Sequence, residues 1–358
     1  MRVAVFGAGN GGLASAFDFA QHGHEVSLYA TPEFGTNVVA VDAAGGISAS
    51  GDLQGFAPVR YSGHDPAEAM DGAELVVVVG PAYATEPLAT AAGPHLTDGM
   101  AVLVCPGSCG GAIAFKHAAG LALDDERCVV GESHTLPYAV RVIEPGVINV
   151  FLKLSTGVFL AGIPRAGTGR LYDLVKEVWP AVEKAESVFQ TTLQNGNPVI
   201  HPAVTLLNTG LLERTGGDFL FYEEGVTESV GRLIEAVDDE RQAIAAALGI
   251  SILSDPALGS KQGYMLEQNY STGYSKAPGF LGIRAQSQLD HRYLTEDVGY
   301  GLVFLSDLAT RLGVPTPVMD ALITTASVVL ARDFRAEAKR TVSTLGLDGL
   351  SREQLSAL

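Results

Sequence analysis

The sequence predicts an α/β domain with a doubly wound sheet over residues 1–185, followed by an all-α domain over residues 186–358. Three observations support this fold class. Short apolar runs alternate with helical stretches over the first half of the chain, as in parallel sheets covered by helices. Residues 73–80 are apolar almost without interruption, which is typical of a strand that is buried on both faces. After about residue 165, strand-like runs stop and apolar residues recur at helical spacing.

The N-terminal element is a strand, a glycine turn and a helix. An apolar run over residues 1–6 leads into Gly7-Ala-Gly-Asn-Gly-Gly12, and a helix is predicted over residues 13–21. Gly7 permits the tight turn, Gly9 lets a pyrophosphate approach the backbone, and Gly12 allows close packing of helix on strand. The helix N-terminus adds free N–H groups and a positive dipole end. This context predicts a Rossmann-type dinucleotide-binding domain, whose cofactor-binding residues include Gly7, Ala8, Gly9, Asn10, Gly11 and Gly12.

The other elements of this domain follow in alternation. We expect strands at residues 25–29, 58–61, 73–80, 101–105 and 127–131, and helices at 38–44, 84–96 and 111–119. Two further strands, at 147–153 and 157–162, are expected to form a hairpin that extends the sheet. Ligands of open parallel sheets bind outside the carboxyl ends of the strands. The residues expected there are Ala30, Thr31, Gly80, Pro81, Pro106 and Glu132.

The form of the cofactor depends on the end of the second strand. NAD-binding folds usually place Asp or Glu there, about 20 residues after the glycine turn, to bind the ribose 2′-hydroxyl. Ala30 and Thr31 stand at this place, and Glu33 can substitute only if the loop curls back. The missing acid removes repulsion against a 2′-phosphate and slightly favours NADP over NAD. Because no Arg or Lys follows nearby, both cofactors stay open.

The composition limits the partners of the protein. The net charge of −17 argues against nucleic acid and anionic membranes. Three cysteines in 358 residues suggest reduced thiols and a cytoplasmic location. We expect no signal peptide and no transmembrane segment, because the apolar runs are too short to cross a bilayer. No cysteine or histidine spacing indicates a metal site.

The second half of the chain reads as helices. Apolar residues between 226 and 248 line one face of a long helix, and helices are expected at 298–312 and 317–330. Ser351 is expected to cap a short terminal helix. Residues 254–278 show no clear period and read as a loop. A helical domain beside a nucleotide domain predicts an active site in the cleft between them.

The segment around His201 contains the first candidate for catalysis. Pro202 suits the first turn of a helix, which places His201 at a helix N-terminus. A neutral imidazole there is able to exchange a proton with a substrate oxygen near neutral pH. Position alone does not separate this role from that of a histidine that only caps its helix.

A later segment supplies two charged candidates. Asp297 is suited to accept a hydrogen bond from His201 and to stabilise the charged ring, whereas Arg292 is suited to hold a carboxylate or phosphate with two hydrogen bonds. The alternatives are a first-turn acid favoured by the helix dipole and a surface arginine.

Three of these features together resemble the opine dehydrogenases, the octopine/nopaline group, and most closely their bacterial N-(1-carboxyethyl)-norvaline type. They are the glycine turn, the segment His201-Pro-Ala-Val-Thr-Leu-Leu-Asn208, and Arg292 with Asp297. The resemblance implies NAD(P)H-dependent reductive condensation of an amino acid with an α-keto acid such as pyruvate, through an imine. It implies that His201 is the catalytic acid/base, paired with Asp297, and that Arg292 binds an anionic group. Thr205, Asn208 and Tyr222 are expected to contact the substrate, and a homodimer is plausible from the family.

Two other functions stay open. The first is a reductase of 2-keto or 3-hydroxy acids with the same two-domain architecture. Such enzymes often use a lysine of the helical domain, and here Lys261 and Lys276 lie in the stretch that reads as a loop. The second is a non-catalytic NAD(P) sensor, in which the His, Asp and Arg set would have no use.

Overall fold

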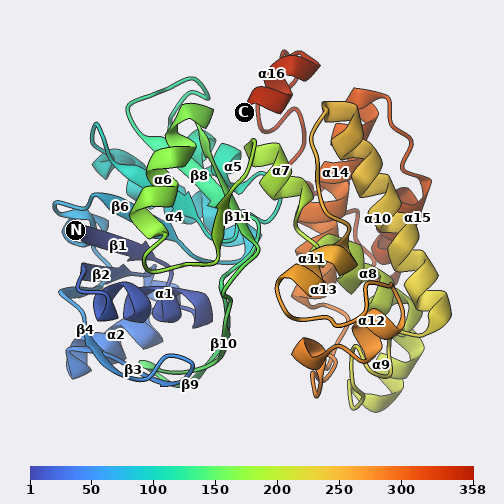
Figure 1. Cartoon of the computed structure of the whole chain (residues 1–358), viewed down its shortest axis with the longest axis horizontal. Helices are drawn as coiled ribbons and strands as arrows, with labels where there is room; N and C mark the ends of the chain where they lie inside the picture. The colour runs from blue at the N-terminus through green and yellow to red at the C-terminus, as the bar shows by residue number, and fades with distance from the viewer. The chain divides into compact units, whose positions relative to one another are not determined.

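The computed structural model describes residues 1–358 and consists of two compact units, Met1–Thr191 and Thr192–Ala357, with Leu358 grouped with the first. The first unit is an α/β domain and the second is helical, so the predicted fold class is confirmed. Figure 1 shows the strands confined to the blue-to-green part of the chain. None of the helices combines the length and the hydropathy that a bilayer span requires.

The N-terminal unit is built on an eight-stranded sheet. Its order is β12-β11-β8-β7-β6-β1-β2-β5, and all neighbours are parallel except β8 and β11. The strand β2 lies on one side of β1, and β6, which comes later in the chain, lies on the other side of β1. The strand order therefore reverses between β1 and β6. The strands are β1 (Arg2–Phe6), β2 (Glu25–Tyr29), β5 (Tyr61–Gly63), β6 (Leu75–Val78), β7 (Ala101–Val104), β8 (Val129–Ser133), β11 (Val158–Ile163) and β12 (Val182–Lys184).

The predicted hairpin of residues 147–153 and 157–162 is wrong. The strand β10 (Val147–Lys153) belongs to a second, four-stranded sheet of order β4-β3-β10-β9, whereas β11 joins the main sheet. The other members are β3 (Gly46–Gly51), β4 (Gly55–Pro58) and β9 (Tyr138–Glu144). The buried residues Ile148 and Val150 alternate along β10 with more exposed ones, as expected for a sheet with one covered face.

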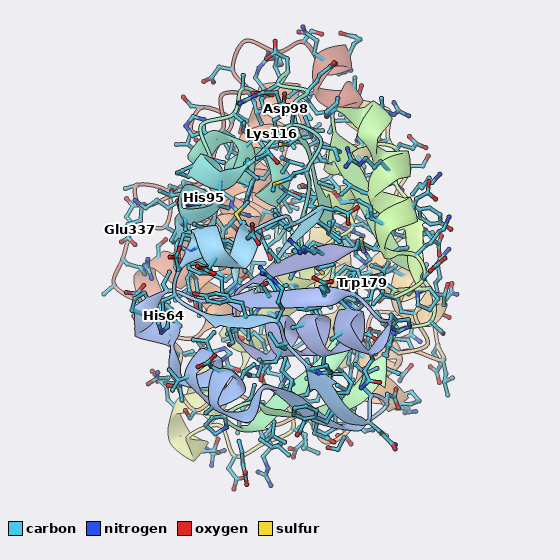
Figure 2. All side chains as sticks on the ribbon, turned by 90° about the vertical axis from the view of Figure 1, so that its left-hand side faces the viewer. His64, His95, Asp98, Lys116, Trp179 and Glu337 are labelled. Carbon is cyan, nitrogen blue, oxygen red and sulfur yellow. The ribbon has the colours of Figure 1, made fainter.

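The helix α1 (Asn10–Gln21) lies between the two sheets, as Figure 1 shows. Its buried Asp18 accepts a hydrogen bond from Tyr138 Oη at 2.6 Å and pairs with Lys153 Nζ at 2.7 Å. Trp179, labelled in Figure 2, donates its indole N–H to the same tyrosine oxygen. These polar contacts attach the small sheet to the helix that follows the glycine turn.

The remaining helices of this unit cover the main sheet. They are α2 (Thr36–Ala44), α3 (Pro66–Met70), α4 (Thr85–Ala92), α5 (Gly111–Ala118) and α6 (Thr168–Val175), with short 3-10 turns at Pro32–Phe34, Ala82–Ala84, Gly93–His95 and Arg165–Gly167. The strand predicted at 58–61 begins only at Tyr61 as β5. The strand β12 also shows that sheet structure continues beyond residue 165, contrary to the expectation from sequence.

The second unit packs its helices around α10 (Glu228–Leu248), which contacts α8 (Asn197–Leu207), α14 (Val303–Leu312) and α15 (Pro317–Val329). Residues 254–278 are not a plain loop, because Ser254 caps the helix α11 by accepting a hydrogen bond from Ala257 N. Ser351 accepts one from Gln354 N, as its predicted cap requires. The helix α7 (Val188–Leu193) spans the boundary between the two units in the sequence. The other elements of the second unit are α9 (Thr209–Thr215), α11 (Asp255–Lys261), α12 (Thr272–Ser275), a 3-10 turn Pro278–Phe280, α13 (Arg292–Thr295), a π-helix Asp297–Leu302 and α16 (Arg352–Ala357).

Candidate active site

A cavity of about 570 Å³ opens at the carboxyl ends of β1, β2 and β6. It lies where the strand order reverses, which is where open α/β sheets bind their ligands. Its lining includes seven of the residues that we predicted to bind the cofactor: Gly7, Ala8, Gly9, Ala30, Thr31, Gly80 and Pro81.

The glycine turn has the shape that a pyrophosphate needs. A Cβ on Gly12 would lie 1.7 Å from the Gly7 carbonyl oxygen, and one on Gly7 would lie 1.9 Å from the Val79 oxygen. Gly7 also has a φ of +112°, which side chains disfavour. At Gly9, by contrast, a Cβ would meet nothing within 4 Å. Gly7 and Gly12 therefore cannot be replaced without a clash between the turn and its neighbours. Gly9 instead leaves open space beside the backbone, as a bound diphosphate requires.

The other predicted cofactor residues do not line this cavity. They are Asn10, Gly11, Gly12, Pro106 and Glu132. Asn10 accepts a hydrogen bond from Val142 N of β9, and Glu132 is fully buried. The Glu132 carboxylate accepts hydrogen bonds from Ala112 N and from Thr191 Oγ1, both at 2.8 Å. This carboxylate therefore organises the start of α5.

The cavity contains one charged side chain at the end of β2. Glu33 lies in the 3-10 turn Pro32–Phe34, where the loop curls back so that Glu33 lines the same cavity as Thr31. The hydroxyl of Thr31 donates a hydrogen bond to Glu33 Oε1 at 3.3 Å. The lining contains no Lys, Arg or His. His64, labelled in Figure 2, lies nearby and donates its Nδ1–H to the Ala30 carbonyl oxygen.

In the helical unit, His201 does not lie at a helix N-terminus. The helix α8 begins at Asn197 with Pro198 in its first turn, so His201 sits inside the helix and Pro202 is an internal proline. The first-turn position that we assigned to Pro202 belongs to Pro198 because the helix starts one turn earlier. The helix α8 packs against α13 and against the π-helix that begins at Asp297.

Both nitrogens of the His201 ring have polar partners. Nδ1 lies 2.7 Å from Asp297 Oδ2 and donates its proton to that carboxylate, so Nε2 carries the lone pair of the neutral ring. Nε2 lies 3.2 Å from the hydroxyl oxygen of Tyr222. All three side chains are buried, at 8%, 5% and 5% exposure for His201, Asp297 and Tyr222. The structure thus joins two residues predicted to be catalytic with one predicted to bind substrate.

Two aromatic rings pack against the imidazole of His201. Tyr293 stacks on it, with centroids 3.9 Å apart and planes 19° apart, and Phe221 meets it edge-on at 5.9 Å. We did not predict either residue. Their spacing in the sequence places them close to predicted site residues, because Tyr293 precedes Asp297 by one helical turn and Phe221 directly precedes Tyr222. Aromatic residues at such places are usually only part of a core, so the spacing alone does not identify them.

The remaining predicted substrate residues have mixed surroundings. Arg292 has a half-exposed side chain that pairs with the buried Glu296 at 3.1 Å. Thr205 lies one turn after His201 on α8, and its buried hydroxyl accepts a hydrogen bond from Gln286 Nε2. Asn208 donates its amide hydrogens to the carbonyl oxygens of Val204 and Gly225, so it closes the end of α8.

A second buried polar cluster lies in the same unit. Arg241 pairs with Asp238, which in turn accepts a hydrogen bond from the backbone N–H of Asp255. Asp255 accepts a hydrogen bond from Tyr274 Oη at 2.5 Å. Burial, followed by repulsion from Asp238, raises the pKa of Asp255 to about 6. No pattern in the sequence predicts that these groups meet.

Comparison with known proteins agrees with this geometry. Residues 184–330 match the family profile described as "NAD/NADP octopine/nopaline dehydrogenase, alpha-helical domain". An opine dehydrogenase of Arthrobacter sp. (strain 1C) is 33% identical over 97% of this chain and 96% of its own length.

Two solved structures of octopine dehydrogenase have the same fold. One, in complex with NADH and agmatine, has a TM-score of 0.81 at 20% identity and covers 98% of both chains. The other, with NADH and pyruvate, has a TM-score of 0.78 at 20% identity and covers 98% of this chain and 96% of its own. The chain therefore belongs to the octopine/nopaline family of opine dehydrogenases, which are NAD(P)-dependent oxidoreductases.

Proposed function

We propose that this protein joins the α-amine of an amino acid to an α-keto acid such as pyruvate and reduces the resulting imine to a secondary amine. The observation that carries the proposal is the buried His201, which is held by Asp297 at Nδ1 and directs Nε2 away from that carboxylate. The full-length likeness to an opine dehydrogenase supports it, as do the ligands of the octopine dehydrogenase structures.

The chemistry assigned to His201 is a proton cycle. The neutral ring accepts a proton from the substrate ammonium, which frees the amine lone pair to attack the ketone carbon. After the attack, a second nitrogen proton moves to the former ketone oxygen, which gives the neutral carbinolamine. The imidazolium then returns the first proton to the hydroxyl of the carbinolamine. The C–O bond breaks, water leaves, and the nitrogen lone pair forms the C=N bond. Asp297 stabilises the imidazolium during the cycle because its carboxylate accepts the Nδ1 proton at 2.7 Å.

The glycine turn and the cavity beside it would hold the dinucleotide, which supplies the hydride for the imine carbon when bound. Arg292 is the residue we propose for a substrate carboxylate, because a guanidinium offers two parallel donors to such a group. Thr205 lies on the His201 side of α8, one turn further on, and is proposed to contact the substrate. Asn208 is left with a structural role, since its amide donors serve the backbone.

We further propose that the coenzyme is NADH, in place of the slight preference for NADP that Ala30 suggested. Glu33 lines the cavity at the end of β2, and no cation lines it. A carboxylate there accepts a hydrogen bond from a ribose 2′-hydroxyl but repels a 2′-phosphate.

Binding measurements on the purified protein test the coenzyme. We expect NADH to bind at least about tenfold more tightly than NADPH, which corresponds to about 1.4 kcal/mol. Glu33→Gln should reduce this ratio, whereas Glu68→Gln, which removes the same charge from the exposed α3, should not. Equal binding of both coenzymes to the wild-type protein would contradict the assignment.

The reaction itself is tested by following NADH oxidation with pyruvate and single amino acids, and by mass spectrometry of the product. A product with a new C–N bond supports the proposal. Oxidation of NADH by the keto acid without an amine would identify a keto-acid reductase instead. Coenzyme binding without any oxidation would indicate a sensor.

A further inference from the structure

The position of Tyr222 raises a question about how a proton leaves His201. Nδ1 is engaged by Asp297, so Nε2 is the one ring nitrogen left for acid–base chemistry. Nε2 has the hydroxyl oxygen of Tyr222 as its hydrogen-bond partner, at 3.2 Å. A substrate oxygen that approached Nε2 in the ring plane would have to take the place of this hydroxyl.

The faces of the imidazole offer no other route. Tyr293 covers one face at a centroid distance of 3.9 Å, and the Phe221 ring is steeply inclined to the imidazole, at 65°, with a centroid distance of 5.9 Å. Ring faces also carry no lone pair or N–H to exchange. A proton that enters or leaves His201 therefore passes through the hydrogen bond between Nε2 and Tyr222.

The Tyr222 ring is itself fixed. It stacks on Phe280 with centroids 4.3 Å apart and planes 15° apart, and it meets Phe221 edge-on at 5.0 Å. Burial raises the pKa of Tyr222 well above 10, so the phenol keeps its proton at neutral pH. At rest it therefore donates this proton to the lone pair of Nε2.

We propose that Tyr222 is the catalytic residue that touches the reacting oxygen, and that it relays protons between that oxygen and His201. This inference rests on the proposed condensation. In the dehydration step, Oη–H transfers its proton to the departing hydroxyl as the C–O bond breaks, while Nε2–H of the imidazolium transfers its proton to Oη. The step releases one water and leaves a protonated imine, a neutral imidazole and an intact phenol.

The earlier deprotonation runs the same relay in reverse. The substrate ammonium gives a proton to Oη while the phenol proton moves to Nε2, which yields the free amine and an imidazolium held by Asp297. No phenolate accumulates in either direction, because Oη gains one proton as it loses another. This suits a buried phenol, whose ionised form is costly in the interior.

The test is Tyr222→Phe in the full-length protein, which keeps the ring that stacks on Phe280. We expect kcat for the condensation to fall at least about tenfold, near the low end of what a positioned acid–base group supplies. Because dehydration becomes slower, the kinetic isotope effect with deuterated NADH should not exceed that of the wild-type protein. Binding of NADH should not change.

The matched control is Tyr270→Phe, which removes another tyrosine hydroxyl of the same unit. This hydroxyl donates to Asp238 at 2.6 Å and does not contact His201. We expect the loss of this hydroxyl to lower thermal stability, because a hydrogen bond to a carboxylate is removed. We expect kcat to stay within about twofold, because this hydrogen bond is not part of the proposed proton path.

Two outcomes would overturn the inference. In the first, Tyr222→Phe loses less than tenfold in kcat. In the second, it loses more, but the isotope effect rises above the wild-type value, which would place the defect in hydride transfer.

If the variant fails to fold, fluorinated tyrosine at position 222 keeps the hydroxyl and its ring. The relay then predicts a shift of the pH–rate profile toward acid, and an unchanged profile contradicts it. A wild-type protein without amine-dependent NADH oxidation would refute the proposed function itself, and this result is seen before any variant is made.

Discussion

At the scale of single residues, the chemistry depends on which nitrogen of His201 is held by Asp297 and which is left to exchange protons. The carboxylate of Asp297 fixes the tautomer by accepting from Nδ1, and the stacked Tyr293 fixes the ring plane. An imidazole held in this way loses little freedom when it becomes charged, because its partner is already in place. This is the preorganisation that general acid–base catalysis requires.

Replacement of His201 by Asn tests this role. We expect kcat for amine-dependent NADH oxidation to fall about 100-fold or more, the range of a general acid–base contribution. The binding constant for NADH should stay within about twofold, because the glycine turn belongs to a different unit. Steady-state turnover and NADH titration measure the two quantities. Unchanged turnover would remove His201 from the reaction.

The buried Asp255 predicts a pH dependence of stability. Its pKa rises from 3.8 to about 6 on folding, so between these values the folded protein holds a proton that the unfolded chain has released. Stability therefore falls as pH rises from about 4 to about 6, and the loss is complete above that. A rise of the pKa from 3.8 to about 6 corresponds to a loss of about 3 kcal/mol of stability.

Asp255→Asn should remove this dependence, because the amide oxygen still accepts from Tyr274 and carries no charge. In urea unfolding, the variant should gain stability relative to the wild-type protein as pH rises from 4 to 6. A difference between the two proteins that stays constant over this range would contradict the assignment.

The residues that the sequence predicted are those with a specific chemical pattern. The pairing of His201 with Asp297 was predicted from the resemblance to the opine dehydrogenases, because position alone left a structural alternative for each residue, and the structure places the two side chains 2.7 Å apart. Tyr293 and Phe221 were missed because an aromatic side chain looks the same in a core as beside a catalytic ring. The location of His201 in its helix was also missed, since Pro198 and Pro202 both suit a first turn.

At the scale of elements, two glycines of the N-terminal turn have different roles. Gly12 is needed for packing of the helix on the strand, and Gly9 is proposed to make room for the coenzyme. Gly12→Ala would place a Cβ 1.7 Å from the Gly7 carbonyl oxygen, so we expect it to destabilise the protein by about 1–3 kcal/mol or more. Gly9→Ala meets no atom within 4 Å and should leave stability nearly unchanged while weakening NADH binding at least about tenfold. Thermal unfolding and NADH titration of both variants measure the two effects. Loss of stability in Gly9→Ala with intact binding would reverse the assigned roles.

The elements that could not be predicted are short or lie in sequence of low β-propensity. The strand β3 has the sequence Gly-Ile-Ser-Ala-Ser-Gly, and β4 contains Gly and Pro. Both are stabilised by pairing within the small sheet and by contact with α1, which are interactions between residues far apart in the chain. The main-sheet strands β1, β6 and β7 were predicted closely because burial on both faces leaves a continuous apolar run that is visible in the sequence.

At the scale of the whole molecule, the protein must bind anions although its net charge is −17. The coenzyme, the keto acid and the amino acid carboxylate all approach a molecule of the same net sign of charge. The cavity adjoining the glycine turn adds the carboxylate of Glu33 and no cation of its own. Attraction for the diphosphate must then come from backbone N–H groups and from the N-terminus of α1, whose field falls off within about one turn.

This arrangement predicts an unusual salt dependence for coenzyme association. Repulsion by the whole molecule acts over the Debye length, which shrinks from about 30 Å at 0.01 M to about 8 Å at 0.15 M ionic strength, whereas the short-range N–H contacts are hardly screened. The association rate constant of NADH, measured by stopped-flow fluorescence, should therefore rise severalfold over this range. Adenosine, which carries no charge, should bind at the same rate throughout. A rate constant for NADH that falls with salt would show that a positive surface attracts the coenzyme, and the long-range repulsion inferred from the net charge would then be wrong.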